Sequence, residues 1–184
     1  MADASTMREV MSALSITALF ALAGCSAVPA DPSAEVERVA APVDEAAQDV
    51  LSAIYAAGLA DGQASGHLEQ CGGSLTGWGG EYQASASAAV GDDLQTAIDR
   101  MTTGLQSSGW TYIGELGGDY PSARLERGDV TIDLMTGGFT VGETRYGAEE
   151  LEVGITTSNA CVTFPEGEHV SDYPEFERTI LPRD

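Results

Sequence analysis

The order of hydrophobic and polar residues divides the chain into segments of different character. Residues 10–24 are mainly apolar and hold no charged side chain. Such a run has the length of the apolar part of a secretory signal and is shorter than the ~20 residues that cross a bilayer. Residues 26–42 carry three prolines and no sustained apolar period, which is typical of a flexible linker. We therefore expect residues 1–24 to be a signal peptide and residues 25–42 to be Cys25 followed by a flexible tether.

Two later segments have the periodicity of helices that bury one side. The first predicts a helix over about 44–60, with Asp44 and Glu45 at its positive end. The second lies within residues 91–110, where Asp92 is the expected N-cap and Gly109 the expected left-handed terminator. Its apolar stripe consists of Leu94, Ile98, Met101 and Leu105.

Other segments alternate between apolar and polar residues, as half-buried strands do. The clearest lie at 129–135 and 151–157, and residues 81–90 alternate with small side chains. Residues 110–116 and 123–127 are plausible antiparallel neighbours. The order of elements predicts one α+β domain at 43–165, an antiparallel β-sheet of about four to five strands with two helices packed on one face. Residues 166–184 are polar and acidic, and we expect an irregular C-terminal tail.

The apolar run ends on Leu22-Ala23-Gly24-Cys25, which resembles the lipobox of bacterial lipoproteins. That resemblance implies cleavage before Cys25, acylation of its thiol with fatty (palmitate) chains, and a location on the outer face of the cytoplasmic membrane. Two acyl chains anchor a protein stably where one is marginal. The alternative is an ordinary secretory signal with a chance cysteine. Residues 1–9 hold Arg8 together with two acidic residues, so translation starts at either Met1 or Met7.

Charge narrows the range of partners. The chain has a net charge of −21 and no lysine, and without residues 1–24 it keeps a charge of −20. Nucleic acids and anionic membranes are bound by clustered Lys and Arg, so we expect no nucleic-acid partner, and contact with the membrane through the lipid anchor alone. The absence of lysine also excludes a Walker A site, a Schiff base and a Ser-x-x-Lys acyl-enzyme. No motif predicts a cofactor.

The cysteine count fits export. With Cys25 acylated, Cys71 and Cys161 remain, and two thiols outside the cell normally pair. We therefore expect a structural disulfide that closes a loop of about 90 residues and stabilises the fold by roughly 4–5 kcal/mol in the chain-entropy model.

The same order of features is similar to the LppA-like lipoproteins of actinobacteria. The likeness is carried by the LAGC lipobox, the Cys71 loop before a strand, the helix closing in Gly109-Trp110 and the late strand ending at Cys161. It implies a surface-anchored domain of uncharacterised activity and supplies no catalytic residues.

The glycine-rich segment 71–82 is the main candidate for binding. Trp78 and Tyr82 would supply a stacking surface for a sugar or peptide; the alternative is a disulfide-pinned turn whose Trp78 only covers the core. Gly62-Gln-Ala-Ser-Gly66 departs from the G-x-S-x-G elbow of serine hydrolases. A cluster of possible metal ligands near the C-terminus matches no metal motif; it consists of Glu166, Glu168, His169 and Asp172. We expect a solvated tail with no metal site there, and the alternative is adventitious binding of a divalent ion.

Three functions follow from these features. The first is a membrane-anchored extracytoplasmic lipoprotein with a non-enzymatic binding or scaffolding domain in the cell envelope. The second is an envelope hydrolase that uses acidic residues near segment 71–82. The third is a passive tethered domain. A binding domain predicts an exposed patch, whereas an enzyme predicts a concave pocket with a carboxyl group of raised pKa.

Overall fold

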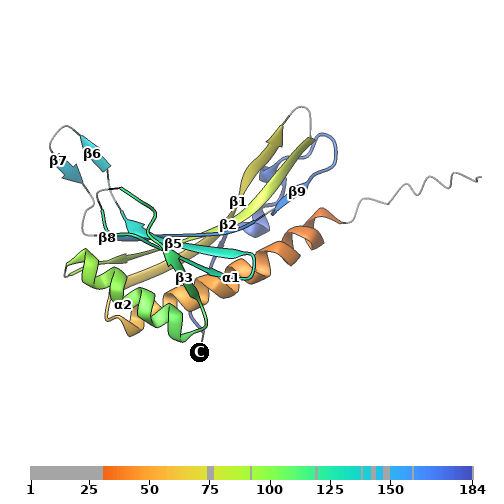
Figure 1. Cartoon of the computed structure of the whole chain (residues 1–184). Helices are drawn as coiled ribbons and strands as arrows, with labels where there is room; N and C mark the ends of the chain where they lie inside the picture. The colour runs from red at the N-terminus through yellow and green to blue at the C-terminus, as the bar shows by residue number, and fades with distance from the viewer. Residues whose placement is uncertain are drawn as a thin grey trace, which may run out of the picture.

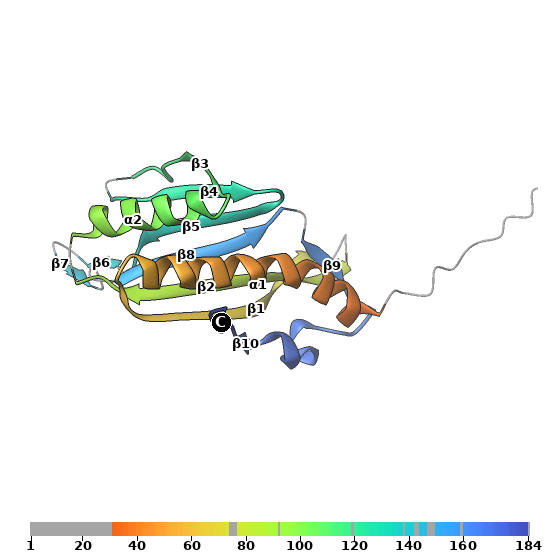
Figure 2. The same ribbon diagram turned by 90° about the horizontal axis from the view of Figure 1, so that it is seen from below.

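The described chain forms an antiparallel sheet with two helices laid against one of its faces (Figure 1, Figure 2). The structure is a computed structural model that describes residues 31–73, 77–91, 93–118, 120–137, 139–141, 144–146, 150–158 and 160–183. For residues 73, 77, 139–141 and 144–146 the structure describes the backbone and not the side chains. The α+β class predicted from the sequence is confirmed.

The sheet has eight strands, more than the four to five expected. Seven follow one another across it, and β9 (Cys161–Thr163) pairs with β2 beyond the end of β8. The order is β10 (Arg178–Thr179), β1 (Ala60–Gly73), β2 (Gly77–Ala89), β8 (Glu150–Thr157), β5 (Val130–Thr136), β4 (Ala123–Arg127) and β3 (Thr111–Gly114). A separate hairpin pairs β6 (Phe139–Val141) with β7 (Thr144–Tyr146).

The strands with clear alternation lie where the sequence predicts them. β4 and β5 form a hairpin turned at Gly128, and β8 pairs with β5 over seven residues. The inward positions of β5 and β8 are buried in full alternation: Val130, Ile132, Leu134, Leu151, Val153 and Ile155. These residues form the sheet side of the core.

The helix α1 (Pro32–Ala56) begins twelve residues before the expected helix at 44, so the expected tether is wrong for residues 32–42. The Asp31 side chain accepts a hydrogen bond from the Ser33 N–H, and Pro32 takes the first helical position, where a missing N–H costs nothing. Pro42 lies inside the helix, yet the helix continues through it. Val36, Ala40 and Val43 are fully buried, and this packing offsets the hydrogen bond that Pro42 removes.

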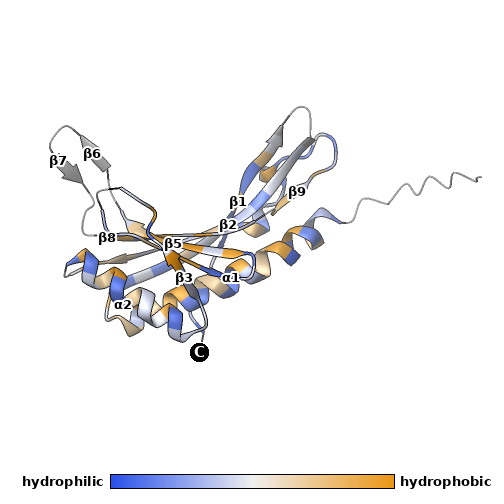
Figure 3. Cartoon of the chain, in the orientation of Figure 1, coloured by the Kyte–Doolittle hydropathy of each residue, from blue (hydrophilic) through white to orange (hydrophobic). Residues whose placement is uncertain are grey.

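The helix α2 (Leu94–Ser107) matches its prediction closely. Asp93 is the N-cap, where Asp92 was expected, and its carboxylate accepts from the Thr96 N–H at 3.2 Å. Asp92 lies outside the described residues. Gly109 follows the helix with φ +91°, as a left-handed terminator does. Along both helices hydrophilic and hydrophobic residues alternate (Figure 3), because each helix buries one side against the sheet.

The segment after β9 is more ordered than an irregular tail. It contains two 3₁₀ helices, η1 (Val170–Asp172) and η2 (Pro174–Phe176), and then β10, which pairs with the edge of β1. Tyr173, Phe176 and Ile180 are buried in the core. The domain therefore extends from Asp31 to the last described residues and exceeds the predicted 43–165.

Candidate functional site

The face of the sheet opposite the helices is polar, and we call it the open face. Paired residues of antiparallel strands point to the same side, so the register assigns a cross-strand row to this face. The middle row is Ser65, Ser85, Gly154, Asp133 and Arg124. The two serine hydroxyl oxygens lie 3.5 Å apart, and the Arg124 guanidinium donates two 2.6 Å hydrogen bonds to Asp133. The next row contains Gln63, Ser87, Glu152 and Met135.

The open face has a depression in its middle at Gly154, because this residue has no side chain. A Cβ at this position would meet no heavy atom within 4 Å, so the space above the backbone is empty. Small hydroxyl side chains lie beside it on β2, and longer polar side chains lie at Gln63 and Glu152. The result is a hydrogen-bonding floor with acidic and amide side chains at its margin.

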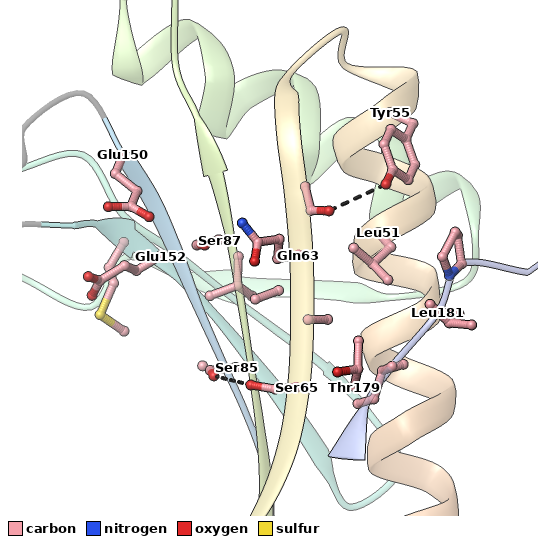
Figure 4. Close-up of a pocket in the computed structure, with 18 residues that line it drawn as sticks. Leu51, Tyr55, Gln63, Ser65, Ser85, Ser87, Glu150, Glu152, Thr179 and Leu181 are labelled. Atoms are coloured by element: carbon pink, nitrogen blue, oxygen red, sulfur yellow. Dashed lines mark hydrogen bonds between the residues drawn. The ribbon is translucent and has the colours of Figure 1, made fainter. Parts of the chain in front are cut away.

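A cavity of about 660 Å³ adjoins this floor, and its lining residues form two groups on either side of β1 (Figure 4). On the open face the group includes Gln63, Ser87, Glu150 and Glu152. The second group lies between β1 and α1 and includes Leu51, Tyr55 and Leu181. The Tyr55 hydroxyl donates to the Gly62 carbonyl at 3.3 Å and bridges α1 to β1.

Negative charge dominates the open face. The register and alternation place six carboxylates there, namely Glu69, Glu81, Glu126, Asp133, Glu150 and Glu152. Asp133 is neutralised by Arg124, and Glu69 accepts a 3.1 Å hydrogen bond from the Gln83 side chain. Within the described residues, no hydrogen bond or ion pair reaches the carboxylates of Glu81, Glu150 and Glu152. The hydrogen bond to Asp133 and then the charge of Asp133, with a smaller contribution from the charge of Glu126, raise the pKa of Arg124.

The two aromatic residues of segment 71–82 do not form one stacking surface. Trp78 is 46% exposed, so it does not serve only to cover the core. Tyr82 is fully buried and points to the helix side, where no ligand reaches its ring. The predicted Trp78–Tyr82 pair is therefore wrong for Tyr82. The segment itself is not a loop: Cys71 lies on β1 and Tyr82 on β2, in one long hairpin.

The Cys71–Cys161 disulfide is present and connects the two strands that flank β2. The strands on either side of a third are normally about 10 Å apart, but these two Cα atoms are 5.9 Å apart. The hairpin must therefore curl around β2 at this end of the sheet. Gly79 lies opposite Cys71, and a Cβ there would overlap the Val162 carbonyl. In Figure 1 this curled end and the β6–β7 hairpin both rise on the open side of the sheet.

A partly buried polar network around Tyr82 on the helix side was not predicted. The Tyr82 hydroxyl donates to Asp44 at 2.7 Å, and Arg178 of β10 contacts Tyr82, Asp44 and Glu37. Burial first, then the hydrogen bond to Asp44 and its charge, raise the pKa of Tyr82, and Arg178 opposes this only in part. Burial acts to lower the pKa of Arg178, but hydrogen bonds to Glu37 and Tyr82 and the charge of Asp44 raise it overall.

A second network fixes the other half of α1. Asp49 is 8% exposed and accepts from the indole N–H of the buried Trp110 at 3.1 Å. Its carboxylate also pairs with Arg127 at 2.8 Å and with Arg183 at 3.1 Å. Both networks join α1 to distant segments and serve the fold. The only sequence signal for them is that Asp44 and Asp49 occur on the apolar side of a helix.

The acidic residues of the C-terminal segment make local hydrogen bonds. Asp172 accepts from the His169 N–H at 2.9 Å, and Glu168 accepts from the Tyr173 hydroxyl. Burial, followed by the hydrogen bond and charge of Glu168, raises the pKa of Tyr173. Among the described residues, no group of three or more His, Cys, Asp or Glu side chains is arranged to hold a metal ion.

The predicted cleavage motif and lipidation site, Leu22, Ala23, Gly24 and Cys25, lie outside the described residues. No helix in the part of the chain that the structure describes is long and apolar enough to cross a membrane.

Comparison with known proteins identifies no relative: no family model, no curated protein and no solved structure matches the chain. The class that the fold defines is therefore stated by architecture alone, an antiparallel α+β domain with one helix-covered face and one open polar face.

Proposed function

We propose that the chain is a lipid-anchored extracytoplasmic protein whose domain binds a partner of the cell envelope on the open face, without catalysis. The observation that carries the anchor is the Leu22–Cys25 lipobox after an apolar run. The Cys71–Cys161 disulfide supports an oxidising location. The resemblance to LppA-like lipoproteins points the same way and names no ligand.

The anchor would hold the domain close to the bilayer. Because α1 begins at Pro32, only six residues separate Cys25 from the helix. Six residues span at most ~20 Å when fully extended, so the N-terminal end of α1 would lie within that distance of the membrane surface. The helix then extends about 37 Å from this end, at 1.5 Å per residue. The open-face cavity adjoins the later part of α1, around Leu51 and Tyr55, and would lie away from the anchor.

Binding accounts for the site better than hydrolysis does. A glycosidase needs two carboxylates on opposite sides of a bond that the enzyme encloses. The carboxylates nearest to segment 71–82 are Glu81 within it and Glu69 just before it, and these two are register partners on one face. Neither lines the cavity, whose open-face part holds Gln63, Ser87 and Glu152. A polar floor on a rigid sheet suits recognition of a partner by hydrogen bonds and charge.

The anchor is tested by the mass of the mature protein. We expect the chain, expressed with its own N-terminus in a bacterial host, to be recovered from membranes with Cys25 as a diacylglyceryl-modified first residue. Cys25→Ala is expected to abolish the modification, and Ser26→Ala, at the adjacent position, to retain it. An unmodified N-terminus on a cleaved, released protein would instead identify an ordinary secretory signal and refute the anchor.

A further inference from the structure

We propose that the open face binds a basic protein segment that carries several cationic side chains spread over about 20 Å. This inference rests on the proposed binding role and names the chemistry of the partner. Both helices lie against the opposite face (Figure 1), so among the described residues no helix covers the open face across β1, β2, β8, β5 and β4.

The charges of the open face lack an internal counter-charge. The chain contains no lysine, and its described arginines already engage other groups. Arg127, Arg178 and Arg183 pair with carboxylates on α1, on the far side of the sheet. Arg124 is the one arginine that the register places on the open face among the described residues, and Asp133 neutralises it. Within the described residues no arginine reaches Glu81, Glu150 or Glu152, so these carboxylates are available to a cationic partner.

The spacing of the carboxylates favours an extended partner over a small cation. Glu69 and Glu81 lie near the curled end of the hairpin, whereas Glu152 pairs with Ser87, six residues further along β2. At about 3.3 Å per residue the two groups are ~20 Å apart. One amine or metal ion would reach only one group. A segment with basic residues at both ends would reach both groups. It would cross the row of His67 and Gln83 and then the Ser65–Ser85–Gly154 row, where the described side chains are short.

The spacing is tested with peptides of equal charge and the detergent-purified lipidated protein. The first probe has two arginines at each end of a six-residue Gly/Ser spacer, and the second has the same four arginines side by side. We expect the spaced peptide to bind about tenfold more tightly, with affinity falling as salt rises, since both partners are exposed. The proposal would be overturned if the two peptides bound with equal affinity. It would also be overturned if spermine competed for the site as well as the spaced peptide does. Displacement by micromolar Ca²⁺ would likewise overturn it.

Paired substitutions locate the binding surface. Glu150→Gln with Glu152→Gln, and separately Glu69→Gln with Glu81→Gln, should each weaken binding of the spaced peptide about fivefold to tenfold. The matched control is Glu35→Gln with Asp99→Asn, which removes the same charge from the helices on the other face. This control should change affinity less than twofold. An equal loss in the control would show attraction to the total charge of the protein and overturn the proposal.

Hydrogen exchange separates this inference from the proposed function. The lipidated protein is exposed to a concentrated envelope extract, before and after a cation-exchange resin removes basic proteins. Protection of β1, β2 and β8 that disappears after the resin is the expected result. Protection that persists would mean a partner that is not basic, which refutes the inference and keeps the binding role. If neither extract protected β1, β2 and β8 from exchange, and neither peptide bound, the binding role itself would be refuted.

Discussion

Gly66, Gly79 and Gly80 lie where side chains or backbone of neighbouring elements press against the sheet. A Cβ at Gly66 would overlap the Tyr82 hydroxyl, and a Cβ at Gly80 would press on the Phe164 ring. The sequence shows these glycines as a composition bias near Cys71 and gives no hint of the side chains that occupy the space. Their role follows only from the register of β1 and β2, which brings Tyr82 across β1.

Replacing Gly66 tests this contact. Gly66→Ala should lower the free energy of unfolding by about 3 kcal/mol, because the new methyl group displaces the Tyr82 hydroxyl from Asp44 and overpacks a buried position. The measurement is urea unfolding followed by circular dichroism. The control is Gly154→Ala in the same sheet, where a Cβ meets nothing, and its effect should stay within about 0.5 kcal/mol. Equal stability of the two variants would contradict the assigned packing.

The paired carboxylates of α1 mark a limit of sequence reasoning at this scale. Asp44 was predicted to lie at the positive end of the helix, but the helix starts at Pro32, and Asp44 contacts Tyr82 and Arg178. Arg178 is 134 residues away in sequence from Asp44. A single sequence carries no signal for a pair this distant, since each residue alone is typical of a solvated surface.

At the scale of elements, periodic segments were predictable and polar ones were not. The stripe of α2 and the alternation of β5 and β8 gave both the type and the position of these elements. β1 escaped prediction because Ala60–Gly73 consists of small and polar residues, with its inward positions filled by Ala64 and Gly66. The first turns of α1 escaped because Pro32 and Pro42 are typical of a linker. Tertiary packing of Val36 and Ala40 outweighs that local preference.

The disulfide controls one end of the sheet. Cys71→Ala with Cys161→Ala should lower the free energy of unfolding by roughly 4 kcal/mol, because the 90-residue separation makes loop closure costly in the unfolded chain. Hydrogen exchange should rise first in β9 and in the Cys71–Gly79 end of the hairpin. β9 has only three residues, and the bridge is what holds it and β1 around β2. The β5–β8 pair, which lies in the middle of the sheet, should lose protection only by the change in the global free energy of unfolding, whereas β9 and the Cys71–Gly79 end should lose more through local opening. An equal loss of protection in all strands would show that the bridge adds no local stability at this end.

For the whole molecule, composition predicted that the surface is acidic but not where the negative charges lie on it. A net charge of −21 without lysine implies an acidic exterior. The fold sorts this charge: carboxylates of α1 pair with Arg127, Arg178 and Arg183, whereas on the open face Asp133 is the one carboxylate paired with an arginine among the described residues. The candidate site could not be predicted, because its residues come from β1, β2 and β8, and β1 was missing from the predicted sheet. The segment 71–82 drew attention through its glycines and aromatics, which turned out to serve packing at Tyr82 and the close approach of β9 at Gly79.

The absence of lysine makes the alkaline stability of the molecule unusually simple. Between pH 9 and 12 the titrating side chains of the described residues are tyrosines, since the arginines stay charged and Cys71 and Cys161 are bridged. The folded-state pKa values of Tyr82 and Tyr173 are raised above the ordinary value near 10. A raised pKa stabilises the fold fully below the unfolded value, and that stability is lost as pH rises beyond it. We therefore expect the free energy of unfolding to be constant to about pH 9 and then to fall, by up to ~1.4 kcal/mol per pH unit for each of the two tyrosines.

Two phenylalanine variants assign this fall to buried phenols. Tyr82→Phe removes one of the two groups, so the slope above pH 10 should decrease by about half, whatever the variant costs at neutral pH. Tyr55→Phe removes a hydroxyl from a tyrosine that is 52% exposed, outside the core, and this control variant should keep the slope of the unchanged protein. Urea unfolding at pH 8, 10 and 11 measures all three proteins. If stability were flat to pH 11, or if Tyr82→Phe kept the full slope, the Tyr82 hydroxyl would not be the buried donor to Asp44 that joins α1 to the sheet.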